Sequence, residues 1–144
     1  DKEIIPMLTH AEMSSIGERI LQEYIDTFNI GSALDWARKL HYPHVRMAGG
    51  YVQIWDTPEA YAADNDKDIM RTGCAWGKTV LDRCEFIQGD DDKLHFSTRW
   101  SRYTTTGEHI ITFDSFYIIT KIDGSWGIQC RSSYAGIFAN NTAF

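Results

Sequence analysis

The chain has 144 residues, which suits one domain with an ordinary hydrophobic core. Apolar residues make up 43% and charged residues 24%, a globular composition and not that of a disordered chain. The formal charge of -6 argues against a nucleic-acid partner, because a phosphate backbone requires a basic face. No apolar run is long enough to span a membrane. We therefore predict one soluble domain over residues 1–144.

Three cysteines, Cys74, Cys84 and Cys130, have neither the number nor the spacing of a disulfide framework or a zinc site. Free, largely buried thiols in the reducing cytoplasm are the expectation. Residues 1–6 show no signal-peptide pattern and lack an initiator methionine, so we expect a trimmed start. No pattern predicts a metal site or a cofactor.

The first half of the chain has helical periodicity. Thr9 and Glu12 have the spacing of a capping box, and apolar residues then recur at helical intervals until Gly31, which is expected to end the helix. A shorter helix is predicted over residues 32–40. A third is predicted over 59–70, after a threonine cap and a proline.

The remaining segments alternate as strands do. A short hairpin is predicted from 44–47 and 51–55. Longer strands are predicted over 76–88, 94–105, 108–122 and 126–134, joined by turn residues at 89–92, 106–107 and 123–124. The order of elements predicts an α+β domain in which helices come first and a curved antiparallel sheet follows.

The last two hairpins permit a prediction of register. With a two-residue turn in each, Arg99 lies opposite Asp114, Arg131 opposite Phe116 and Ser133 opposite Asp114. A three-residue loop or a bulge would change these pairings. On this register Arg99, Asp114 and Arg131 form one cluster on one face of the sheet.

The two faces of the predicted sheet differ in character. The face with the charged cluster also holds Ser101, Tyr103 and Ser133, and we expect it to line a pocket. The opposite face is apolar and aromatic. An uncovered apolar face is unfavourable in a monomer, so we expect a homodimer through it. Its main residues are Phe96, Trp100, Phe113 and Tyr117.

The element order, with residues 22–31, 42–46 and 121–128, resembles the nuclear transport factor 2-like fold. This fold is shared by ketosteroid isomerases, limonene epoxide hydrolases, scytalone dehydratases and SnoaL-like polyketide cyclases. The resemblance covers nearly the whole chain and implies a cone in which three N-terminal helices pack on a curved antiparallel sheet. Because one cone hosts many chemistries, it predicts the fold and leaves the reaction open.

The resemblance to ketosteroid isomerases is incomplete at the site. Tyr24 stands where those enzymes place the tyrosine that donates to the substrate oxyanion. Their general base falls near Met47, and their second oxyanion donor falls at Phe116 or Ile118, none of which carries a proton to exchange. The resemblance therefore does not imply steroid isomerisation.

The other enzymes of the fold match no better. Arg99 stands where the epoxide hydrolases place an arginine, but their catalytic aspartates correspond to Ser101 and Arg131. His95 is expected on the inner face, without the partner histidine of the dehydratases. Neither chemistry is implied.

Two hypotheses of function remain open. The first is a pocket for an anionic or carbonyl-bearing small molecule, in a lyase or isomerase without cofactor. The second is a non-catalytic ligand binder or dimeric module, in which the charged cluster is structural and Tyr24 belongs to the core. An arginine beside Asp114 would weaken it as a base. The catalytic candidates are Tyr24, Arg99 and Asp114; the binding candidates are Arg131, Tyr103, Ser101, Ser133, Phe116, Met47, His95 and Trp55.

Overall fold

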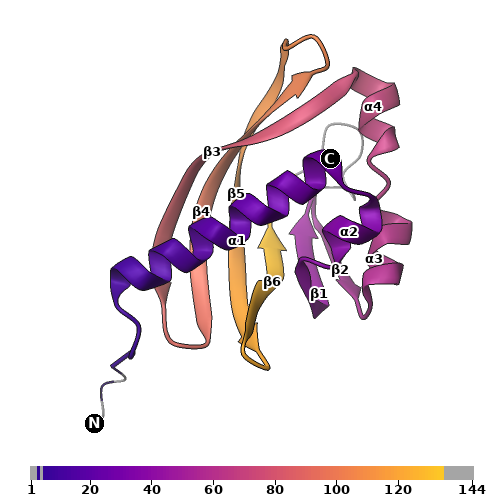
Figure 1. Ribbon diagram of the computed structural model, residues 1–144. Coiled ribbons are helices and arrows are strands. Elements are labelled where there is room, and N and C mark those ends of the chain that lie inside the picture. The colour runs from indigo at the N-terminus through magenta and orange to yellow at the C-terminus, as the bar shows by residue number, and fades with distance from the viewer. Residues whose placement is uncertain (1–2, 4, 135–144) are drawn as a thin grey trace.

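A computed structural model describes residue 3 and residues 5–134 of the chain (Figure 1). The helices are α1 (His10–Ile30), α2 (Ala33–Ala37), α3 (Pro58–Asp64) and α4 (Asp68–Cys74). The strands are β1 (Leu40–Ala48), β2 (Tyr51–Trp55), β3 (Trp76–Gly89), β4 (Lys93–Thr104), β5 (His109–Ile122) and β6 (Ser125–Ser132).

The strands form one curved, six-stranded sheet in the order β2-β1-β6-β5-β4-β3. Neighbouring strands are antiparallel except for β1 and β6, which pair in parallel. α1 runs across the concave face of the sheet, and α2, α3 and α4 lie at one end (Figure 1). The predicted α+β fold, with helices packed on a curved sheet, is confirmed.

The first two helices begin where the sequence predicts. Thr9 and Glu12 form the expected capping box, and the N–H of Gly31 closes α1 on the carbonyl of Thr27. The second helix is shorter than predicted, because it ends at Ala37 and Leu40 is already the first residue of β1.

The predicted third helix is two helices, and long-range contacts explain the break. The side-chain oxygen of Asn65 accepts a hydrogen bond of 2.7 Å from Arg46 on β1. The amino group of Lys67 donates to the carbonyls of Phe28 and Gly31, at the end of α1. Carbonyls at a helix C-terminus lack partners within the helix, so Lys67 provides one. These two contacts hold the connection between α3 and α4 in a non-helical path.

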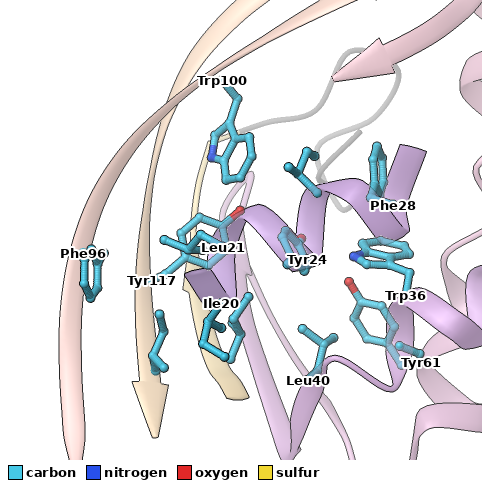
Figure 2. Packing of buried hydrophobic residues seen from close by; sticks show 14 of the residues in the cluster. Ile20, Leu21, Tyr24, Phe28, Trp36, Leu40, Tyr61, Phe96, Trp100 and Tyr117 are labelled. Carbon is cyan, nitrogen blue, oxygen red and sulfur yellow. The ribbon is translucent and has the colours of Figure 1, made fainter. Parts of the chain in front are cut away.

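The apolar face of the sheet is the concave one, which reverses the predicted sides. Phe96, Trp100 and Tyr117 are 0%, 1% and 2% exposed, and they form the core beneath α1 (Figure 2). Phe113 packs against the edge of this core. The prediction that these four residues form a dimer interface is therefore wrong. Alternation shows which residues share a face, but it does not show which face the helix covers.

The register of β4 and β5 is as predicted, whereas that of β5 and β6 is not. Arg99 pairs with Asp114. A register shift between Ile118 and Ile119 then places Arg131 opposite Tyr117 instead of Phe116. Because successive side chains point to opposite faces, this shift moves Arg131 to the concave side.

Candidate functional site

A small cavity lies between α1 and the concave face, and its lining is aromatic with a few polar groups. Its free volume is about 10 Å³, enough for about one water molecule. The residues that line it are Tyr24, Ile25, Phe28, Trp36, Thr79, Trp100, Arg102, Phe113, Tyr117 and Arg131.

Two tyrosines and an arginine meet on one side of the cavity. The rings of Tyr24 and Tyr117 lie 5.8 Å apart, and the hydroxyl of Tyr117 is within hydrogen-bonding reach of Tyr24. Burial raises the pKa of Tyr117, so its phenol stays protonated. Burial alone would lower the pKa of Arg131, but the adjacent tyrosines, Tyr117 foremost, raise it on balance. Arg131 therefore remains charged beside two hydroxyl groups.

A second guanidinium lines the same cavity. Arg102 is buried, and its guanidinium lies 4.8 Å from the ring of Phe113 and 5.9 Å from that of Phe28. Burial, followed by the positive charge of Arg131, lowers the pKa of Arg102 to about 10. Both arginines are thus cationic at neutral pH. Such donors suit a carboxylate or a polarised carbonyl oxygen.

Behind this cavity lies a second polar layer that fixes the end of the sheet. Arg46 donates to the side-chain oxygens of Gln53, at 2.8 Å, and Asn65. Its guanidinium lies 4.8 Å from the ring of Trp55, whose indole N–H donates to Asp64. Trp55, a predicted binding residue, is therefore a core side chain that does not line the cavity.

His44 belongs to this layer as well. Its Nδ1 lies 3.2 Å from the carbonyl oxygen of Ile128, and a carbonyl only accepts, so Nδ1 carries the proton. The ring stacks on Trp55 and meets Tyr61 edge-on. Burial lowers the pKa of His44 to about 3, which keeps the imidazole neutral.

The predicted cluster of Arg99, Asp114 and Arg131 is not formed. The side chains of Arg99 and Asp114 are 50% and 49% exposed and bond at 2.8 Å on the convex face. The hydrogen bond from Arg99 lowers the pKa of Asp114, as expected for an exposed ion pair. Their placement in a pocket was wrong because the covered face of the sheet is the other one.

Six further predicted residues lie outside the cavity, among them Phe116, whose ring meets that of His95. Ser101 donates to Asp82 and contacts Thr112 at 2.8 Å. The amino group of Lys78 lies over the ring of Tyr103, and His95 contacts Gln88 and Phe116. Met47 is exposed, and the hydroxyl groups of Ser133 and Ser115 share a hydrogen bond. Of the predicted site residues, Tyr24 and Arg131 line the cavity.

Arg102 and Tyr117 line the cavity and were missed as site residues. Both stood on the face that was predicted to point outward. A signal was present, because Arg102 continues the row of Leu94, Phe96 and Trp100 on β4. A charged residue in an otherwise apolar row marks a polar spot in a buried face.

The described residues contain no group of three or more His, Cys, Asp and Glu side chains placed to hold a metal ion. In the same part of the chain, no helix has the length and apolar character needed to cross a membrane. The three cysteines are free thiols, each half-buried.

Comparison with solved structures identifies the fold. A protein of unknown function with a cystatin-like fold from Nostoc punctiforme superposes with a TM-score of 0.69 at 10% identity, over 88% of this chain and 92% of that one. A nuclear transport factor 2-like protein of unknown function from Shewanella oneidensis gives 0.62 at 12% identity, over 81% and 94%. A Catenulispora acidiphila protein in complex with S-DNPA gives 0.66 at 11% identity, over 87% and 94%.

The chain thus has the nuclear transport factor 2-like cone fold, as the sequence resemblance implied. No family model matches the sequence, and no curated protein matches it.

Proposed function

We propose that the chain binds a small molecule bearing a carboxylate or carbonyl group in the cavity between α1 and the concave face. The observation that carries this proposal is the lining itself, in which two guanidiniums and two tyrosines share one aromatic cavity. Arg102 and Arg131 would bind the oxygen atoms of the ligand, and Tyr24 and Tyr117 would donate hydrogen bonds to them.

The lining favours binding over catalysis. A lyase or isomerase that acts beside a carbonyl needs a group that accepts a proton. The described residues that line the cavity include no Asp, Glu or His. Asp114, the predicted base, lies on the convex face in an ion pair with Arg99. The Catenulispora acidiphila protein in complex with S-DNPA supports ligand binding by this fold.

A ligand larger than one water requires the cavity to open. Phe113 is the half-buried residue at its edge, and the guanidinium of Arg102 packs on its ring. Rotation of Phe113 would widen the cavity and expose Arg102 to the incoming ligand. The buried rings of Trp100 and Tyr117, by contrast, lie deep in the core.

Native mass spectrometry of freshly purified protein tests the proposal, followed by calorimetric titration with small carboxylic acids. We expect a bound acid, and we expect Arg131→Gln to lose it while Arg99→Gln retains it. Arg99 is the matched control because it is an arginine of the same sheet on the opposite face. If no acid binds at millimolar concentration, or if both variants behave alike, the proposal fails.

We also propose that a second copy of the chain packs on the convex face. Val52 and Ile54 are 65% and 64% exposed there, and Met47, Phe116 and Ile118 extend the apolar surface across β1 and β5. The charged pair of Arg99 and Asp114 lies on the same face, so a two-fold contact can place opposite charges together. This interface replaces the predicted one, whose residues Phe96, Trp100, Phe113 and Tyr117 lie on the concave side.

A further inference from the structure

A second and larger groove shares no lining residue with the core cavity. It runs between α1, the connection from α2 to β1, and the β5–β6 hairpin, and its volume is about 440 Å³. Ligand pockets usually measure about 300–1,000 Å³. Its functional groups come from Arg19, Glu23, Arg38, Lys39, His41 and Trp126.

The groove is positively charged although the chain as a whole carries -6. Arg19, Arg38 and Lys39 supply three permanent cations. The one carboxylate in the lining, Glu23, lies 3.4 Å from Arg19. Asp35 lies in electrostatic range of Arg38, and the backbone N–H of Ser32 donates to its carboxylate. Arg38 and Lys39 therefore give the groove a net attraction for anions.

His41 is oriented in this groove by two hydrogen bonds in series. Its Nδ1 lies 2.9 Å from the hydroxyl of Thr120, which itself donates to the side-chain oxygen of Gln129. The Thr120 oxygen therefore accepts, and Nδ1 of His41 carries the proton. Burial lowers the pKa of His41, which favours the neutral ring. Nε2 is then left with a lone pair.

Gly127 provides the space in which this ring lies. A Cβ atom at position 127 would stand 2.6 Å from Cδ2 and 2.7 Å from Nε2 of His41. Any other residue would displace the imidazole, so the position of His41 depends on the absence of a side chain on β6. The ring is therefore held from both sides, by Thr120 and by Gly127.

Trp126 adds a flat apolar surface. Its ring is half-buried, and the amino group of Lys121 lies 5.9 Å from it. The indole offers a flat surface on which a planar ring can stack. The groove thus combines an anion-binding end with an aromatic surface.

We propose that this groove binds a phosphate monoester that carries a flat ring, as a nucleoside monophosphate does. Arg38 and Lys39 bind the phosphate oxygens, Nε2 of His41 accepts a hydrogen bond from a P–OH or hydroxyl group, and Trp126 stacks on the ring. A tetrahedral phosphate offers oxygens in several directions, which suits two cations on consecutive residues of the α2–β1 connection. This site is independent of the core cavity and of the function proposed for it.

Calorimetric titration of the full chain with AMP tests the proposal, with adenosine and inorganic phosphate as partial ligands. AMP is expected to bind at least about tenfold more tightly than either. The double variant Arg38→Gln, Lys39→Gln should weaken AMP binding at least tenfold. The control Arg71→Gln removes an exposed arginine on α4, outside the groove, and should leave it unchanged. Absence of binding by both AMP and riboflavin 5′-phosphate at millimolar concentration overturns the proposal.

A further variant tests whether AMP binding depends on the position of the His41 ring or only on the surface charges. Gly127→Ala keeps every charge and displaces the ring of His41, so AMP binding should weaken several-fold at constant salt. Circular dichroism verifies that the variant is folded, and His41→Phe should weaken AMP binding to a similar degree. If folded Gly127→Ala and His41→Phe both bind AMP as tightly as the natural sequence, the groove is no more than a charged surface and the proposal fails.

Discussion

Arg131 lies directly opposite Tyr117 across β5 and β6, and the two side chains hydrogen-bond within the cavity beneath α1. This relationship depends on the register shift between Ile118 and Ile119. Without the shift, the guanidinium would join Arg99 on the convex face, and the cavity would lose one of its two cations. One irregularity in the sheet therefore determines the chemistry of the proposed site.

Tyr117→Phe tests the role of this pair in binding. The substitution removes one hydroxyl group and keeps the ring, so the core packing should persist. Loss of one hydrogen bond to a charged or polar ligand group corresponds to about 1 kcal/mol, or roughly a fivefold weaker affinity for the acid that the chain binds. Calorimetry measures the change. Tyr103→Phe, on a tyrosine that does not line the cavity, should leave the affinity unchanged.

Gly17 allows α1 to approach the sheet closely. A Cβ atom there would stand 1.8 Å from the ring of Phe96, which is fully buried. We expect Gly17→Ala to lower the free energy of unfolding by about 1–3 kcal/mol, despite the helix preference of alanine. Urea denaturation measures the loss.

A companion variant checks the cause. Replacing Phe96 by leucine makes space, so Gly17→Ala should cost less in that background. Ser15→Ala, on the exposed side of α1, should change stability little. An equal cost of Gly17→Ala in both backgrounds would refute the close contact.

His44 makes stability depend on pH. Its folded pKa of about 3 lies below the ordinary value of 6.5, so the unfolded chain binds more protons between these limits. The free energy of unfolding should therefore fall as pH falls from about 6.5, at up to about 1.4 kcal/mol per pH unit. Urea denaturation at several pH values measures this slope.

His44→Phe should reduce the slope, because phenylalanine packs on Trp55 and does not titrate. His109→Phe replaces an exposed histidine and should keep the slope of the natural sequence. If His44→Phe and the natural chain lose stability equally on acidification, burial of a neutral imidazole is not its cause.

The proposed dimer makes a prediction about the convex face. At micromolar concentration, sedimentation velocity should show a dimer of the natural chain and a monomer of Ile54→Glu, since a charge in an apolar interface is unfavourable. Ile30→Glu is the control, because Ile30 is 89% exposed at the end of α1 and away from that face. A monomeric natural chain would rule out this interface.

Much of the fold was predictable because its signals are local. The capping box of Thr9 and Glu12 and the hairpin that pairs Arg99 with Asp114 involve residues close in sequence. The helix cap and this hairpin needed only periodicity and turn chemistry. Tyr24 was placed by its resemblance to the fold, whereas Arg131 was placed by a hairpin register that differs from the observed one.

The site depends on contacts between residues far apart in the chain. The alternation of side chains along β4 places Trp100 and Arg102 on the same face of the sheet. Only the packing of α1 shows that this face is buried. The register shift between Ile118 and Ile119 was not predicted from the sequence, and the break before Asp68 depends on Arg46 and on the end of α1. Burial and register are decided by what covers each face, so the tertiary structure alone placed Arg131 with Tyr117 and separated it from Arg99.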